Sequence, residues 1–487
     1  MKIFIFSFRK ILFCILAFSL FAFVTENAVG EQFKEREYWP TKGWKTSIPE
    51  KQGMDSAKLL MADEFIQNRL PDAFSLLVVK NGYLVFEKYY SWGSREKYAE
   101  VHSVTKSFTS ALIGIALDKG YLNSVDQKLV DFFPEYITDE SDPMKKEISL
   151  RHLLTMSAGF KWNDWGPSMR KWLYFSPDWV KSAIQLPQEN NPGEVFNYNS
   201  STSHLLSAIL SKSTETSTLD FAKQYLFEPL GIQSAYWHVD QQGYNIGGFG
   251  LGLSARDLAK FGFLYLNNGY WNGQSIVSEI WVKESTSQQI QTVSHPIYGE
   301  FQYGYQWWVK KVDDCKSYRA RGKRGQFIAV VPELDLVIAV TSNPGRPHPP
   351  TSIHYNPLFD LVATAVQRER PPKKPLVPVD LPPDVKAFIT DYNQASYNKD
   401  LLKISELISD RFLHEGVNKQ MAVSFLAGAN SYISEAKIII TRFEPVGEKV
   451  DVDVWLKDKY FESLFMKGSR LIKENGNWKW YGNQVIK

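Results

Sequence analysis

Residues 103–115 read SVTKSFTSALIGI, with a serine and a lysine three positions apart at the start of an apolar helical pattern. On a helix, residues i and i+3 share one face, so the Ser103 hydroxyl and the Lys106 amine can meet. An amine packed against an apolar wall has a lowered pKa, which lets it take a proton from a neighbouring hydroxyl. The apolar stripe behind the serine comes from residues at helical spacing, Val104, Phe108, Ala111, Leu112 and Ile115. We therefore expect a nucleophilic serine at a buried helix start.

The Ser-x-x-Lys pattern alone does not identify a catalytic site, because it also occurs at Ser7, Ser94, Ser168, Ser396 and Ser434. Such patterns are commonly helix caps with a solvated lysine. A second group of residues, Phe196-Asn197-Tyr198-Asn199-Ser200, sets Ser103 apart; it lies between a Pro-Gly loop and an apolar helical pattern. Tyr198 and Ser200 face the same side there. A phenol beside a lysine ammonium has a lowered pKa and can act as a base.

A third group, Gly322-Lys323-Arg324-Gly325-Gln326, precedes the strand pattern Phe327–Val331. A glycine-flanked strand edge can offer backbone N–H groups to an oxyanion, and its cations can bind a substrate carboxylate. Read alone, a basic turn is commonly solvated, and a buried tyrosine commonly does no more than satisfy its hydroxyl. The three groups together favour acyl-transfer chemistry.

In this order the three groups resemble the motifs of the serine β-lactamase and penicillin-binding-protein superfamily: Ser-x-x-Lys, Tyr-x-Asn or Tyr-x-Ser, and Lys-x-Gly or His-x-Gly. The resemblance covers about residues 50–370. It is strongest to the β-lactamase-related, class C-like hydrolases, which include esterases, D-amino-acid peptidases and 6-aminohexanoate-dimer hydrolases. Further likeness lies in residues 82–87, 150–159 and 250–259, which read GYLVFE, LRHLLTMSAG and GLGLSARDLA.

The resemblance implies a role for each matching residue. Ser103 would be the nucleophile, Lys106 its activator and Tyr198 the general base. The N–H groups of Ser103 and Gln326 would form the oxyanion hole. Substrate binding would fall to Ser200 and to the third motif, Lys323, Arg324 and Gly325. The resemblance implies no cofactor and no metal.

The chain departs from the lactamase pattern at two positions. Ser200 stands where those enzymes carry an asparagine that helps hold the β-lactam side chain, and Arg324 stands where they often have threonine. The serine resembles the esterase and 6-aminohexanoate-dimer hydrolase branch, so we expect hydrolysis of a small ester or amide. The alternatives are a D-alanyl peptidase or weak β-lactamase acting on peptidoglycan-like amides, and a catalytically silent binder of cell-wall fragments.

Strand patterns lie at both ends of this region, with helix patterns between them. We expect strands over Phe74–Lys80, Tyr83–Tyr90, Tyr305–Lys310, Gln326–Val331 and Leu336–Thr341, the first two joined by an Asn81-Gly82 turn. We expect helices over Ser56–Asn68, through much of Val101–Leu266, and over Leu358–Glu369. Residues 31–370 are thus predicted to form an α/β-type (α+β) fold. An antiparallel sheet flanked by helices would carry an all-helical subdomain, as in the β-lactamase/transpeptidase fold.

Residues 371–383 contain six prolines and predict an extended linker. Beyond it, residues 384–487 show two helical patterns followed by alternating strand patterns, which indicates a second, α+β domain. This tail resembles the nuclear-transport-factor-2-like (SnoaL-like) cone fold in residues 391–393, 412–416 and 476–481. We expect it to serve a helper role, by binding a ligand or by forming a homodimer.

Residues 1–30 read as an export signal, with Lys2, Arg9 and Lys10 before an apolar run from Ile11 to Val24. The run is shorter than the ~20 residues of a membrane-spanning helix. An uncleaved anchor is the alternative. We expect a periplasmic or secreted protein without a membrane span after removal of the leader. Cys315 is the only cysteine beyond the leader, so no internal disulfide is expected.

Composition and motifs exclude several other classes of function. The 487 residues carry a formal net charge of +3, which gives no basic surface for nucleic acid. The sequence has no Gly-x-Ser-x-Gly elbow, no phosphate-binding glycine loop and no His-Glu-x-x-His motif, and its eight histidines show no ligand spacing. The expected partner is a small ester or amide substrate.

Overall fold

The computed structural model describes residues 35–164, 166–290, 301–345, 355–370, 376–414, 417–423, 436–460 and 462–484. The chain divides into two compact units, Met1–Glu37 and Tyr38–Lys487, and every element below belongs to the second. The predicted leader and residues 371–375 of the predicted linker lie outside the described residues. Within the described ranges, no helix combines the length and the apolar character needed to cross a bilayer.

Seven strands form one antiparallel sheet in the order β2-β1-β12-β11-β10-β9-β8. The strands are β1 (Ala73–Lys80), β2 (Tyr83–Tyr89), β8 (Gln302–Tyr303), β9 (Trp308–Val309), β10 (Tyr318–Gly322), β11 (Gln326–Val331) and β12 (Leu336–Ser342). Because β1 pairs with β12, the sheet joins the two ends of the region, and the helical middle is inserted between them. The predicted fold class, an antiparallel sheet flanked by helices, is confirmed.

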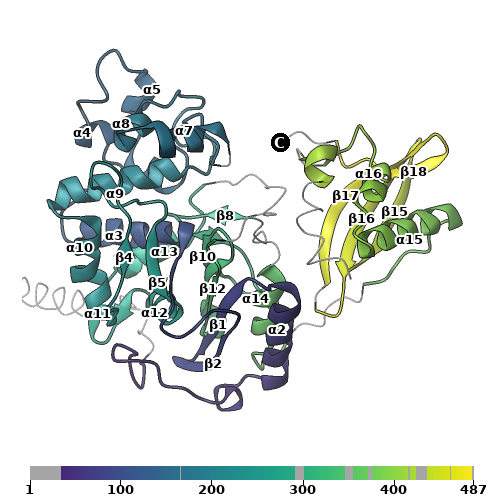
Figure 1. Ribbon diagram of the computed structural model, residues 1–487, viewed down its shortest axis with the longest axis horizontal. Helices are drawn as coiled ribbons and strands as arrows, with labels where there is room; N and C mark the ends of the chain where they lie inside the picture. Colours follow the sequence, from purple (N-terminus) through teal and green to yellow (C-terminus); the bar gives the residue numbers. More distant parts are fainter. Residues whose placement is uncertain are drawn as a thin grey trace, which may run out of the picture. The chain divides into compact units, whose positions relative to one another are not determined.

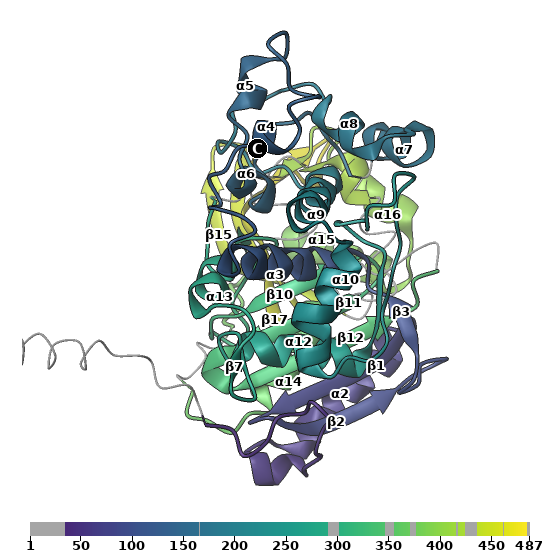
Figure 2. The same ribbon diagram turned by 90° about the vertical axis from the view of Figure 1, so that its left-hand side faces the viewer.

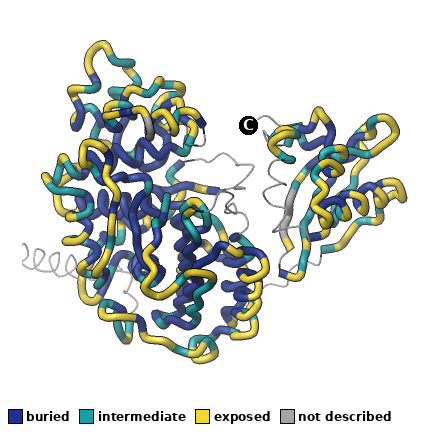
Figure 3. The backbone as a smooth tube through the Cα atoms, viewed as in Figure 1, coloured by how far each residue is buried: buried dark blue, intermediate teal, exposed yellow. Residues whose placement is uncertain are grey.

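Alternate residues of the strands face two separate cores. Leu77, Val330 and Val337 point to the core shared with α3 (Thr105–Asp118) and α12 (Ala255–Leu266). Leu76, Val340 and their alternating neighbours point to the core shared with α2 (Ser56–Arg69) and α14 (Asn356–Thr364). Helices therefore cover both faces of the sheet, and its central strands β1, β11 and β12 are buried (Figures 1 and 3).

The inserted middle is mainly helical. Its further helices are α4 (Leu129–Phe132), α5 (Pro143–Lys146), α6 (Leu150–Leu154), α7 (Pro167–Phe175), α8 (Trp179–Ile184), α9 (Ser200–Thr214), α10 (Thr218–Ala222), α11 (Glu228–Leu230) and α13 (Glu279–Ser285). A small sheet, β3 (Tyr98–Glu100), β5 (Leu251–Ser254) and β4 (Tyr236–Trp237), and the hairpin β6 (Tyr270–Trp271) and β7 (Gln274–Ser275) complete it. Helix α3 lies between α9 and the large sheet (Figure 2). The buried helix α3, which carries Lys106 and directly follows Ser103, is thus packed between the large sheet and α9.

The strand predictions for this region are incomplete. The short strands β3 to β8 and strand β10 were not expected, and the expected strand Tyr305–Lys310 is only the two residues of β9. Arg319 and Arg321 gave β10 a polar pattern, yet both side chains are buried. The Arg319 guanidinium lies 4.5 Å from the Phe359 ring centre and donates to Asn356 Oδ1 at 2.7 Å. Contacts with α14, which is distant in sequence, therefore stabilise a buried arginine in this strand, and the sequence of the strand alone does not reveal them.

The C-terminal residues have a hydrophobic core of their own. Helix α15 (Pro383–Tyr397) precedes α16 (Leu401–Glu406) and a short hairpin, β13 (Leu413–His414) and β14 (Val417–Asn418). The four-stranded sheet β15-β16-β17-β18 consists of Lys437–Val446, Lys449–Lys457, Glu462–Glu474 and Asn477–Trp480. Phe388 of α15 packs in one cluster with Val452 and Leu471 of this sheet. The elements are α+β as expected; the nuclear-transport-factor-2-like assignment stays a prediction.

Candidate active site

Ser103 lies in a single 3₁₀ turn, His102–Val104, that leads directly into α3. His102 has a left-handed φ of 47°, a strained conformation for a residue with a side chain. His102 Nδ1 lies 3.3 Å from Glu100 Oε1, a contact that ties this turn to β3. Ser103 is partly exposed, whereas the residues from Val104 to Ala111 are buried. The turn thus presents one hydroxyl at the edge of a closed core.

Lys106 is buried directly behind that hydroxyl. Its Nζ donates to Ser103 Oγ at 3.0 Å, to Ser200 Oγ at 3.0 Å and to the Gly248 carbonyl at 2.8 Å. Three acceptors match the three protons of an ammonium group. Burial lowers the pKa of Lys106 to about 8, against the opposing effect of the Asp164 charge. Near neutral pH this lysine can therefore lose its proton with little cost and take one from Ser103.

Ser200 opens α9, where Asn199 caps the helix by accepting from the N–H groups of Ser201 and Thr202. The Ser200 hydroxyl donates to Asp164 Oδ2 at 2.7 Å while it accepts from Lys106. The Ser200 N–H donates to Asp164 Oδ1 at 2.8 Å. A continuous chain of hydrogen bonds thus runs from Ser103 through Lys106 and Ser200 to the Asp164 carboxylate.

Tyr198 meets the same lysine through its ring. Lys106 Nζ lies 4.9 Å from the centre of the Tyr198 ring, and Trp308 stacks on Tyr198 with the two ring centres 5.5 Å apart. A cation over an aromatic face is attracted by the ring quadrupole. The structure therefore brings Tyr198 together with Lys106, while the proton-transfer role of its hydroxyl stays a prediction.

The third motif forms the turn between β10 and β11. Arg324 and Gly325 have left-handed φ values of 65° and 89°, and a Cβ on Gly325 would lie 1.9 Å from the Tyr355 hydroxyl. Gly322 is the last residue of β10 before the turn, and a Cβ at this position would lie 2.3 Å from the Val101 carbonyl. The hairpin is thus packed against the segment that leads into Ser103.

Lys323 is exposed at the tip of this hairpin, and Arg324 donates to the Pro344 carbonyl. Partial desolvation of the Lys323 ammonium lowers its pKa, and the nearby Arg324 charge lowers it further. The Asp164 charge opposes both effects. Among the described residues Lys323 forms no hydrogen bond or ion pair, so its ammonium is available to a ligand.

Gln326 is fully buried opposite Gly322 at the start of β11. Its side chain exchanges two hydrogen bonds with the Ser342 backbone, at 2.7 and 3.1 Å. The Ser342 hydroxyl donates to the Gly325 carbonyl at 3.1 Å. Because that carbonyl and the Gln326 N–H belong to one peptide group, these contacts fix the direction of the N–H. Its part in an oxyanion hole, with the Ser103 N–H, stays a prediction.

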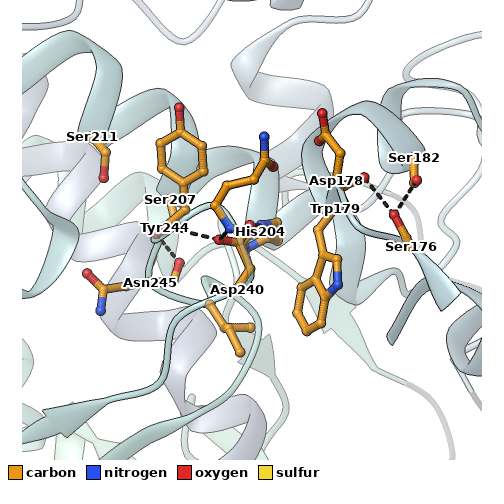
Figure 4. Close-up of polar contacts among 12 residues, drawn as sticks. Ser176, Asp178, Trp179, Ser182, His204, Ser207, Ser211, Asp240, Tyr244 and Asn245 are labelled. Carbon is orange, nitrogen blue, oxygen red and sulfur yellow. Dashed lines mark hydrogen bonds and ion pairs between the residues drawn. The ribbon is translucent and has the colours of Figure 1, made fainter. Parts of the chain in front are cut away.

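A network of buried polar contacts joins α9 to residues 240–245, in the segment that precedes Gly248 (Figure 4). Asp240 Oδ2 lies 3.0 Å from His204 Nε2 on α9, and both side chains are fully buried. Ser207 on the same helix donates to the Asn245 carbonyl at 2.6 Å, and Thr109 on α3 donates to the Gly247 carbonyl at 2.9 Å. The segment that ends at Gly248 is therefore fastened to both helices.

Two groups of this site were not predicted from the sequence. Asp164 lies in a loop without a motif, and Gly248 contributes only a backbone carbonyl. The consecutive glycines Gly247 and Gly248 are the sequence feature that could have indicated this site. A Cβ on Gly247 would lie 2.0 Å from the Ser203 carbonyl, so only glycine lets the two backbones come this close. Across the residues that the structure describes, no three His, Cys, Asp or Glu side chains are grouped as a metal ion would require.

Comparison with known proteins identifies the family and the fold of this chain. A family model described as beta-lactamase matches residues 61–359. The chain is 24% identical over 329 residues to 6-aminohexanoate-dimer hydrolase of Paenarthrobacter ureafaciens, which covers 63% of this chain and 80% of that protein.

Among solved structures, EstCE1, a hydrolase with promiscuous acyltransferase activity, is similar at a TM-score of 0.54 and 14% identity, covering 64% of this chain and 98% of EstCE1. The octameric penicillin-binding protein homologue from Pyrococcus abyssi gives a TM-score of 0.50 and 18% identity, covering 87% of this chain and 95% of that one. At these identities the structural likeness shows the fold.

Proposed function

This chain belongs to the beta-lactamase family, and on that premise we propose that it is an exported serine hydrolase acting on a small ester or amide. The reaction would pass through an acyl-enzyme on Ser103. The observation that carries the proposal is the buried Lys106 Nζ, 3.0 Å from a partly exposed Ser103 Oγ. The relative named 6-aminohexanoate-dimer hydrolase supports an amide substrate, and EstCE1, a hydrolase with promiscuous acyltransferase activity, shares the fold.

Acylation begins when the neutral Lys106 amine takes the Ser103 proton and Ser103 Oγ attacks the substrate carbonyl carbon. The carbonyl oxygen becomes an oxyanion, which the N–H groups of Ser103 and Gln326 would stabilise; removing one such donor typically costs 10²–10³ in rate. The bond to the leaving group breaks as Tyr198 or Lys106 returns the proton to it. Water, deprotonated by the same groups, then attacks the ester carbonyl and releases the acid and Ser103.

Ser200 supports an ester or simple amide over a penicillin. Its one hydroxyl proton is already donated to Asp164 at 2.7 Å. A β-lactamase asparagine at this position has an amide N–H to give to the substrate, whereas this serine has none left. Lys323, which is exposed at the hairpin tip, would bind a polar group of the substrate.

Labelling with a fluorophosphonate tests the nucleophile. We expect one adduct, located on Ser103 by peptide mass spectrometry, and loss of both the adduct and p-nitrophenyl ester hydrolysis in Ser103→Ala. Ser94→Ala is the matched control, because Ser94 begins another Ser-x-x-Lys pattern but is exposed and away from a buried lysine.

The same reagents separate the alternatives. Absence of an adduct on the native protein would contradict the proposal and favour a silent binder of cell-wall fragments. Rapid nitrocefin hydrolysis without turnover of short esters would instead favour the D-alanyl peptidase or β-lactamase alternative.

A further inference from the structure

Asp164 occupies an unusual place for a carboxylate in a serine hydrolase site. It lies in the loop between α6 and α7 and accepts three hydrogen bonds: from the Ser200 N–H at 2.8 Å, the Ser200 hydroxyl at 2.7 Å and Trp162 Nε1 at 2.6 Å. Ser200 in turn accepts from Lys106, the neighbour of Ser103. The carboxylate is therefore rigidly held three hydrogen bonds away from the proposed nucleophile, and it is partly exposed.

The charges around the site are unevenly distributed. Lys106 of α3 and Lys323 and Arg324 of the β10–β11 hairpin are cations of this region, and the Arg321 guanidinium of β10 lies 4.5 Å from the ring centre of Trp308, which stacks on Tyr198. Asp164 acts electrostatically on both Lys106 and Lys323, and no other carboxylate of the described residues contributes to the pKa of either lysine. One residue thus supplies the negative charge that both lysines experience.

A fixed charge in a partly desolvated site changes the affinity of a charged ligand group. At ~8 Å and an effective dielectric constant of about 30, one unit charge changes binding about tenfold. The sign of the effect depends on the ligand charge, and a neutral ligand is unaffected. Asp164 also takes up the only donor proton of Ser200, so a substrate carboxylate or carbonyl gains no hydrogen bond there.

We infer that Asp164 is a specificity-determining residue that disfavours carboxylate-bearing substrates relative to neutral and cationic ones. This inference rests on the proposed function. It narrows the substrate class by charge: for esters or amides of one shape, the Asp164 carboxylate disfavours an anionic group next to the scissile bond and so opposes the cations of the β10–β11 hairpin.

Three acetate esters of one shape test the inference: those of 3-hydroxybenzoate, 3-methylphenol and 3-(trimethylammonio)phenol. For Asp164→Asn we expect kcat/KM for the anionic ester, relative to the neutral one, to rise about tenfold. The relative value for the cationic ester should fall by a similar factor. Differences in leaving-group reactivity cancel, because each ratio is compared with the same ratio in the unmodified chain.

Asparagine suits this test because its Oδ1 can still accept from the Ser200 N–H and Trp162 Nε1, so the charge is removed with little change of shape. Its Nδ2, which replaces the Oδ2 that accepts from the Ser200 hydroxyl, can donate to Ser200 Oγ. Asp164→Glu restores the charge and should restore the discrimination. Asp139→Asn is the matched control: it removes a carboxylate that is fully exposed and paired with Lys146, and it should change neither ratio. Fluorophosphonate titration counts the folded active sites of each variant.

Unchanged ratios in Asp164→Asn would overturn the inference while leaving ester hydrolysis by Ser103 in place. An unmodified chain that hydrolyses none of the three esters and takes no fluorophosphonate label would contradict the proposed function, and the inference with it.

Discussion

Lys106 shows why this site is chemically active at the scale of one residue. An ammonium with 1% of its surface exposed is costly to bury unless it is hydrogen-bonded. The fold supplies three oxygen acceptors and one carboxylate beyond them, but it supplies no direct ion pair to Lys106 among the described residues. The lysine is therefore held in place while its charge is only weakly stabilised, which is what a base for Ser103 needs.

The pH dependence of activity follows from this environment. Burial lowers the pKa of Lys106 to about 8, so the neutral, basic form becomes dominant above that pH. We expect kcat/KM for a neutral ester to rise with pH and to level off above about pH 8. Asp164 raises the pKa of Lys106, so Asp164→Asn should lower it and move the rise to lower pH.

Stopped-flow or steady-state rates between about pH 5 and 10 provide the measurement, and Lys106→Met is the control. Loss of a general base typically costs 10²–10⁴ in rate, and the rise near pH 8 should vanish with it. A profile that keeps the same midpoint in Lys106→Met would assign the titrating group to another residue.

At the scale of elements, helix α9 connects the site with the segment behind it. The helix carries Ser200 at its first turn and His204 one turn later, and His204 contacts Asp240 at 3.0 Å. Asp240 Oδ1 also accepts from the Gln242 and Tyr244 N–H groups at 2.9 Å. One buried carboxylate thus joins α9 to the loop that ends at the Gly248 carbonyl.

We expect Asp240→Ala to lower the free energy of unfolding by about 1–3 kcal/mol, because it leaves the fully buried His204 and two partly buried backbone N–H groups without their acceptor. Urea unfolding followed by tryptophan fluorescence measures the change. Asp139→Ala, at an exposed ion pair, should change the stability by less than about 1 kcal/mol. Equal stabilities of the two variants would show that the His204–Asp240 contact contributes little to the fold.

Sequence patterns predict those elements whose determinants are local. The hairpin turn at Asn81-Gly82 is one, since both residues have the left-handed φ values, 53° and 87°, that this dipeptide favours. Ser103 and Lys106 are another, because their spacing on one helical turn already brings them together. Asp164 could not be predicted, since it is positioned through contacts with Trp162 and with Ser200, 36 residues away.

At the scale of the whole molecule, the large sheet is built from both ends of the hydrolase region. Ser75 and Thr341 are paired across β1 and β12, and their hydroxyl groups lie 2.6 Å apart. Strand β10, which lies against the segment before Ser103, follows the helical middle in sequence and pairs with β9 and β11 in this sheet. The site is therefore complete only when elements from residue 73 to residue 342 have assembled, which links activity to folding of the entire region.

Export is the prediction that concerns the whole chain. The apolar run Ile11–Val24 follows three basic residues, as in a cleavable leader, and the remaining chain has a single cysteine, Cys315, which is buried. The exported protein would therefore form no internal disulfide in an oxidising compartment, and burial would shield the Cys315 thiol from oxidation. We expect the secreted or periplasmic protein to begin near residue 30, as measured by intact mass and N-terminal sequencing after expression with its own leader.

Replacing Leu16 and Leu20 by arginine should break the apolar run and keep the precursor in the cytoplasm. A full-length 55.9 kDa product of the unmodified chain in the membrane fraction would instead show that the leader is an anchor.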